Sequence, residues 1–294
     1  MATNPKTDVL ERLREGITNL TSSDQWTQWL DIQRRFHNYS WGNCLLIALQ
    51  RPDATRIAGY RRWQEMGRHV LKGEKGIAIL APIIYRNKIE SEDAETDAIS
   101  HGVVTAFRPA YVFDVSQTDG EPLPEVTHRL TGPEPRGAFQ SLVTVAEGFG
   151  FHVELSDSLG STNGDFNFDL NRIRINENVE AAQAVKTLAH EIGHGLLHRP
   201  ETYPADATRG LLELEAESVA YVVCSELGLD SSQYSFGYVA GWAGGGEAAS
   251  KLISSSAQRI NLAARKILTE FGVDTALERN AAAPTPGSHE PVLA

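Results

Sequence analysis

Residues 187–198 read TLAHEIGHGLLH, and this stretch decides how the rear half of the chain is interpreted. Four residues of an α-helix advance by about 400° and roughly 6 Å, so His190 and His194 leave one face and converge. Two neutral imidazoles are good zinc ligands and need one further protein ligand to leave an open catalytic position. Glu191 lies on the flank of that face, within reach of a water molecule. The stretch therefore predicts a hydrolytic zinc centre with Glu191 as its catalytic base.

His198 repeats the four-residue spacing, but it lies about 12 Å from His190 along an unbroken helix, too far to share one ion. A metzincin site would need a glycine bend and a later histidine, which HEIGHGLLHRP does not supply. We therefore expect His198 to support the site or the fold without binding the metal. The alternative for the whole stretch is an exposed helix with unpartnered histidines. That alternative fits poorly with an apolar stripe consisting of Leu188, Ile192, Leu196 and Leu197.

The third ligand is expected from residues 213–221, which read ELEAESVAY. Glu213 and Glu217 share one helical face, whereas Glu215 points about 200° away from Glu213. Ala216 and Ala220 lie along the same stripe, and small residues let two helices approach closely. A glutamate buried without a partner costs free energy, so a cation facing this stripe would explain it. A solvated acidic stripe is the alternative.

HEIGH followed by ELEAESVA resembles the zincin peptidase domain of the ImmA/IrrE family, whose pattern is HExxH and then E-x-x-A. The resemblance covers residues 137–270 approximately and implies a gluzincin-like zinc metalloendopeptidase. By position it implies that Glu213 is the third zinc ligand and that Ala216 is the alanine of the pattern. It also implies that Glu217 orients a ligating histidine without touching the metal. The sequence does not identify the residue that stabilises the oxyanion. Tyr221, Tyr234 and Tyr238 are candidates only because a tyrosine hydroxyl can donate a hydrogen bond.

The front half differs from the rear half in charge. The formal net charge is -11 overall, which argues against wholesale wrapping by nucleic acid, but residues 1–125 carry only -2 of it. Residues 51–88 contain nine Lys or Arg residues and three acidic residues. An anion-binding surface, if the chain has one, is therefore expected in this basic segment.

Two longer stretches, NYSWGNCLLIALQRPDATRIAGYRRWQEMGRHVLKGEKGIAILAPI and AYVFDVSQTDGEPLP, resemble the N-terminal single-stranded DNA-binding domain of the ArdC antirestriction family. The similarity covers residues 8–125. ArdC-like proteins carry this domain ahead of a zincin domain, in the order seen here. The resemblance implies that the front half binds single-stranded DNA and that the whole chain acts in antirestriction.

Single-strand sites combine a basic groove for phosphates with aromatic faces on which bases stack. The basic segment interleaves both kinds of side chain. Our candidates for DNA contact are Arg56, Arg61, Arg62, Trp63, Arg68, Lys72, Lys75 and Tyr39, with Tyr60 lying among them. An alternative stays open for the aromatics, because the spacing also suits core residues for Phe36, Trp41, Tyr60 and Trp63.

We expect an α+β fold of two domains. Residues 8–125 form the DNA-binding domain from helices and a small sheet, 126–136 a proline-rich linker, 137–275 the zincin-like domain and 276–294 a disordered tail. Ser22 is expected to cap the second helix, Pro82 to mark an edge strand, and Asn178 to cap the metal-binding helix. A turn near Asn171 should join two paired strands.

Three functions remain open from sequence. The first is a single-stranded DNA-binding antirestriction protein that shields incoming DNA. The second is a DNA-responsive regulatory metalloendopeptidase that cleaves a specific protein, and the third is an acidic DNA mimic that occupies restriction enzymes.

Cys44 and Cys224 form no CxxC pair, so neither a disulfide framework nor a cysteine zinc site is indicated. No stretch resembles a signal peptide or a membrane span, so we expect a cytoplasmic protein without a membrane partner.

Overall fold

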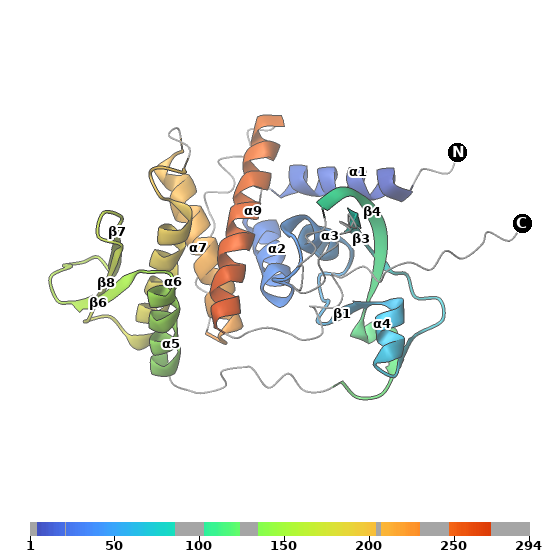
Figure 1. Ribbon diagram of the computed structural model, residues 1–294, viewed down its shortest axis with the longest axis horizontal. Coiled ribbons are helices and arrows are strands. Elements are labelled where there is room, and N and C mark those ends of the chain that lie inside the picture. Colours follow the sequence, from blue (N-terminus) through green and yellow to red (C-terminus); the bar gives the residue numbers. More distant parts are fainter. Residues whose placement is uncertain are drawn as a thin grey trace, which may run out of the picture.

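The computed structural model describes residues 5–20, 22–85, 103–123, 135–203, 207–229 and 247–271. Helices and strands are mixed in both halves, as predicted (Figure 1). No helix in these ranges is both long enough and apolar enough to span a membrane. Some predicted segments lie outside the described residues. They are the tail (276–294), the linker except for Pro135 and Arg136, and the acidic stretch of residues 89–100.

The front half begins with three helices, α1 (Pro5–Asn19), α2 (Ser23–Arg35) and α3 (Trp41–Gln50). The predicted cap of α2 is confirmed, because the Ser22 hydroxyl accepts a hydrogen bond from the Gln25 backbone N–H at 3.3 Å. α3 ends two residues before Pro52, as expected where the residue preceding proline leaves the helical region. The short helix α4 (Tyr60–Glu65) follows after the first strand.

Two small sheets complete the described part of the front half. One has the strand order β1 (Ile57–Gly59), β4 (Val103–Asp114) and β3 (Ile77–Tyr85), all antiparallel. The other pairs β2 (Arg68–Val70) with β5 (Thr118–Gly120), which follows the 3-10 turn η1 (Val115–Gln117).

β3 is an edge strand, which confirms the prediction made from Pro82. Its open edge is covered by amide side chains of α3. Gln50 bonds both the N–H and the carbonyl of Ala78, and Asn43 does the same for Leu80, at 2.9–3.0 Å. These two side chains act as a substitute strand and protect the edge from pairing with another chain.

The rear half starts with α5 (Pro135–Gly148), followed by a three-stranded sheet in the order β6 (His152–Ser156), β8 (Arg172–Asn176), β7 (Gly164–Asn167). β7 and β8 are antiparallel, and Asn171 in the turn between them has a φ of 47°, as the predicted turn requires. Among the described residues that follow are the helices α6 (Ala181–Leu197), α7 (Arg209–Glu226) and α9 (Glu247–Glu270).

The predicted N-cap of α6 is wrong. The helix begins at Ala181, with Glu180 in the cap position and without a side-chain capping bond. Asn178 is instead used in the preceding turn, where its backbone N–H donates to the Asn176 side chain at 3.0 Å. The side-chain oxygen that accepts in this turn belongs to Asn176, two residues before the expected cap.

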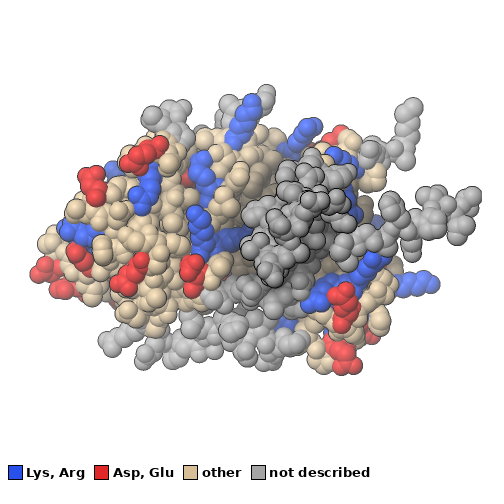
Figure 2. All heavy atoms as spheres, in the orientation of Figure 1, with Lys and Arg blue, Asp and Glu red and all other residues tan. Residues whose placement is uncertain are grey.

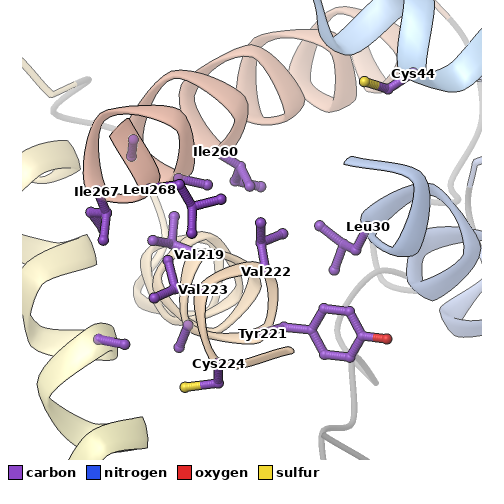
Figure 3. Packing of buried hydrophobic residues seen from close by; sticks show 14 of the residues in the cluster. Leu30, Cys44, Val219, Tyr221, Val222, Val223, Cys224, Ile260, Ile267 and Leu268 are labelled. Atoms are coloured by element: carbon purple, nitrogen blue, oxygen red, sulfur yellow. The ribbon is translucent and has the colours of Figure 1, made fainter. Parts of the chain in front are cut away.

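The two halves share one hydrophobic core. α2 of the front half packs against α7 of the rear half. Figure 3 shows the valines of α7 between the apolar side chains of α9 and Leu30 of α2. The contact includes two polar bonds, from Trp26 Nε1 to Ser218 Oγ at 2.9 Å and from Tyr221 Oη to Asp31 Oδ1 at 3.0 Å. α7 thus joins the halves together with α9, which contacts α1 and α3 and donates from Asn261 to the Tyr39 carbonyl at 3.1 Å.

Candidate metal centre and nucleic-acid face

The metal-binding residues are brought together by close packing of α6 on α7. A Cβ atom on Gly193 would lie 3.3 Å from Ala216 Cα and 3.4 Å from Val219 Cβ, so a side chain there would push the helices apart. Gly193 stands between the two histidines of HEIGH. The glycine and the alanine of the two motifs thus face each other, and their small size lets α7 deliver its glutamate to the histidines of α6.

His190, His194 and Glu213 converge on one point. The distance between the two histidine Nε2 atoms is 3.0 Å, and Glu213 Oε2 lies 3.3 Å from His190 Nε2 and 3.6 Å from His194 Nε2. A tetrahedral zinc with bonds of about 2.0–2.1 Å separates its ligand atoms by roughly 3.3–3.4 Å. The three ligand atoms therefore fit a single tetrahedral cation and leave a fourth position for water or substrate.

Glu191 lies beside this triangle and is 7 % exposed. Burial raises the pKa of its carboxyl group, against the opposing effect of the neighbouring histidines. A carboxylate with a raised pKa is a better proton acceptor near neutral pH. The position and environment of Glu191 suit a general base.

Glu217 contacts the outer nitrogen of a candidate ligand. Its Oε2 lies 3.2 Å from His190 Nδ1, and its Oε1 accepts from Lys186 Nζ at 2.8 Å. Burial alone would lower the pKa of His190, but hydrogen bonds to Glu213 and Glu217 raise it to about 9. The two carboxylates thus stabilise positive charge at this spot. Since Glu217 occupies Nδ1, the Nε2 atom is left to face a cation.

A second buried chain of polar groups lies behind His194. His194 Nδ1 is 2.8 Å from His198 Nδ1, and His198 Nε2 is 3.2 Å from Glu215 Oε2. Glu215 is fully buried, and its carboxylate accepts from the Arg259 guanidinium through both oxygens and from Tyr203 Oη at 3.2 Å. With His194 Nε2 given to a cation, His194 Nδ1 carries the proton and donates to His198. His198 then donates from Nε2 to Glu215.

Glu215, Tyr203 and Arg259 were missed from sequence. Glu215 does point away from Glu213, as predicted. It is connected to the site through His198, which contacts both Glu215 and His194. A buried glutamate on α7 demands a cation, which is the signal that could have revealed it. The cation is Arg259 on α9, 44 residues later. A partner so distant in sequence cannot be predicted from residue spacing.

Two family models match the chain. Residues 6–113 match the N-terminal domain of the anti-restriction factor ArdC, and residues 146–224 match the IrrE N-terminal-like domain of the M78 peptidases. The chain has the ArdC-like architecture. The second match contains HEIGH and Glu213, so the candidate metal centre lies inside the part of the chain that matches a metallopeptidase-type domain.

Two solved structures share the fold of this chain. The metal-free crystal structure of the antirestriction protein ArdC from the R388 plasmid is 22 % identical, has a TM-score of 0.58, and the match covers 90 % of this chain and 98 % of that one. The Mn(II)-bound structure is 23 % identical, with a TM-score of 0.54 and coverage of 92 % and 98 %. An uncharacterised protein of Bacillus anthracis is 23 % identical over 278 residues, 82 % of this chain, which spans about half (47 %) of that relative's length.

The structure corrects both aromatic candidates for DNA contact. Tyr39 is 6 % exposed and Trp63 is 1 % exposed. The Trp63 indole also donates to the Phe113 carbonyl at 2.9 Å, so its polar edge is already used inside the ArdC-type domain. Neither ring is offered to a base. Trp63 belongs to the core, as the alternative held, and Tyr39 lies in the core as well.

The basic candidates divide into engaged and exposed side chains. The Arg68 guanidinium donates to Thr118 and to the carbonyls of Gly120 and Glu121, so it braces β2 against β5 and is withdrawn as a DNA contact. Arg62 donates to Glu65 Oε2 at 2.9 Å. Arg56 is half-buried, and the exposed candidates are Arg61, Lys72 and Lys75.

On the face shown in Figure 2, acidic side chains gather over the end formed by β6, β7 and β8, which agrees with the larger negative charge of the rear half.

The structure also corrects the proposal that Tyr221 steadies the oxyanion. Its ring lies on the α2 side of α7 (Figure 3) and its hydroxyl donates to Asp31. Tyr234 and Tyr238 lie outside the described residues.

Proposed function

We propose that this ArdC-like chain is a single-stranded DNA-binding antirestriction protein that carries a zinc-dependent peptidase centre and acts in the cytoplasm. One observation supports the enzymatic part above all others. His190, His194 and Glu213 place their ligand atoms at tetrahedral separations, with the buried Glu191 beside them. Two nitrogens and one carboxylate oxygen suit zinc, whereas manganese prefers more oxygen ligands.

The residues of the site have separate tasks. His190, His194 and Glu213 would hold a divalent cation, which would supply Lewis-acid polarisation of a peptide carbonyl. Glu191 takes a proton from the attacking water and returns it to the leaving amine. Glu217 and His198 hold the ligand rings by their outer nitrogens, so that each Nε2 keeps its direction.

The front half supplies the DNA-binding part of the proposal. Its match to the ArdC N-terminal domain and its exposed Arg61, Lys72 and Lys75 support contact with a nucleic-acid backbone. The same basic segment disfavours the acidic DNA mimic.

A second candidate is a DNA-responsive regulatory metalloendopeptidase. It is favoured by α7, which carries Glu213 on one face and bonds α2 through Ser218 and Tyr221 on another. A change in the front half would reach the ligand helix directly.

The test is protection of unmodified plasmid DNA that enters a restricting host, compared between wild type and Glu191→Gln. The substitution keeps the size of the side chain but removes the base. If protection depends on peptidase chemistry, the variant loses it while keeping zinc and oligonucleotide binding. Full protection by the variant would confine antirestriction to the DNA-binding half, and absence of protection by wild type would contradict the antirestriction proposal.

A further inference from the structure

One face of β4 carries a row of aromatic side chains. Successive strand residues point to opposite faces, so Phe107, Tyr111 and Phe113 share a face. Tyr60, at the first position of α4, joins the row because its ring lies 6.4 Å from the Phe113 ring in an edge-on arrangement. We call Tyr60, Phe107 and Tyr111, with Phe113 between them, the aromatic strip.

The aromatic strip is exposed where other aromatic side chains are not. Tyr60, Phe107 and Tyr111 are 50 %, 49 % and 53 % exposed. Among the residues whose burial the structure describes, these three are the large aromatic side chains that are more than about a third exposed. Single exposed apolar residues need no explanation, but their collection on one strand face of one half indicates a binding surface.

The sheet leaves the strip open because its two faces are covered differently. The opposite face places Ile77, Ile79 and Val112 in the main core. On the strip's own face, Val9 of α1 packs with Ala78 of β3, and α1 contacts part of β4 as well, yet Phe107 and Tyr111 stay about half exposed.

Glycine at position 76 contributes to the strip. A Cβ atom there would lie 2.9 Å from Tyr111 Cβ and 3.1 Å from the Phe113 ring, so any side chain would collide with the row. The absence of a side chain lets the aromatic rings lie over the turn that leads into β3.

Basic side chains border the strip. Arg61 follows Tyr60 directly, and Lys75 precedes Gly76; both are exposed. The carboxylates nearby are engaged elsewhere: Glu65 accepts from Arg62, and Glu74 accepts from Gln117 at 2.8 Å. Cations beside exposed rings match the two chemical parts of a single strand, its phosphates and its unpaired bases.

We propose that the aromatic strip stacks the bases of single-stranded nucleic acid while Arg61 and Lys75 contact its phosphates. The inference rests on the single-strand binding proposed above and assigns it to residues. Stacking on ring faces tolerates any base, so binding through this surface is independent of sequence. Duplex DNA buries its base faces and cannot use the strip.

The test uses a fluorescent oligo(dT) of about 20 nucleotides and the full chain, with binding followed by anisotropy. Tyr111→Ala and Phe107→Ala should each weaken binding by about 10-fold or more, as expected for loss of a stacked base. Tyr111→Phe keeps the ring and should bind like wild type. Leu155→Ala is the matched control, because Leu155 is 60 % exposed on β6, away from the strip.

Salt dependence separates rings from charges. The alanine variants should keep the slope of log affinity against log salt, because they remove no phosphate contact. Thermal melting checks that each variant folds. Unchanged oligonucleotide affinity in the Phe107→Ala/Tyr111→Ala double variant, or an equal loss of duplex binding, would overturn the assignment to the strip. If wild type binds no oligonucleotide at all, the proposed DNA-binding function fails instead.

Discussion

The metal centre is built on two packed helices, whereas the aromatic strip lies mainly on one strand of a sheet. On α6, the four-residue spacing of His190 and His194 already fixes their relative directions, and the packing of α7 on α6 brings the Glu213 carboxylate to them. In the front half, the sequence pointed to Tyr39 and Trp63, which are buried, whereas the exposed rings include two from β4. Helical spacing is a local property. The division of aromatic residues between core and surface depends on which elements pack together.

The largest effect is expected at the catalytic base. Glu191→Gln should lower hydrolysis of a fluorescein-labelled unfolded protein by about 10²- to 10⁴-fold, the usual contribution of a general base. Zinc and oligonucleotide affinity should stay at wild-type values, because Glu191 is neither a ligand nor part of the front half. Wild-type turnover in this variant would remove Glu191 from the chemistry.

The next effect concerns the groups that hold the ligand rings. Glu217→Gln and Glu215→Gln should each weaken zinc binding by about 10- to 100-fold, as is typical when a ligand loses its outer hydrogen bond. Competition with a chromophoric chelator measures this. Glu215→Gln also leaves Arg259 without its carboxylate, so Glu215→Gln/Arg259→Gln serves as a control for stability. If Glu215→Gln binds zinc like wild type, the chain through His198 has no influence on the site.

A smaller effect separates buried from exposed aromatics in the front half. Trp63→Phe should lower the free energy of unfolding by about 1–3 kcal/mol, because it removes the hydrogen bond to Phe113 and part of a buried ring. Oligonucleotide affinity of the folded protein should not change. Urea unfolding and anisotropy on the same samples test both statements, and a specific loss of affinity with unchanged stability would return Trp63 to the DNA-binding surface.

The smallest effect is expected from single charges. Arg61→Gln or Lys75→Gln should reduce the salt slope of oligonucleotide binding by about 0.7, the value for one lost single-strand phosphate contact. Arg68→Gln is a comparison variant, because its guanidinium is engaged by β5, and it should alter stability more than slope. Equal slopes in all three variants would place the phosphates elsewhere.

Much of the secondary structure was predictable because its signals are short-range. Ser22 caps α2, Pro52 follows the end of α3, and Asn171 takes the left-handed turn between β7 and β8. The failure at Asn178 has the same origin, since an asparagine near a helix start can serve the turn as well as the cap.

The unpredictable part of the site depends on contacts between distant elements. Arg259 meets Glu215 only because α9 packs on α7, and Trp26 meets Ser218 only because the two halves share a core. Neither pair is separated by a short, regular spacing, so neither pair can be recognised in the sequence. The resemblance placed Glu217 beside a ligating histidine, and the structure puts it against His190, but it offered nothing for Glu215.

The central claim is that α6 and α7 form one metal site, and metal stoichiometry tests it most directly. Protein purified without chelator, incubated with zinc and freed of excess metal, should retain about one zinc per chain. The His190→Ala/His194→Ala variant should retain none while its oligonucleotide binding persists. Wild-type protein without zinc after this treatment, or equal zinc in both proteins, would contradict the account.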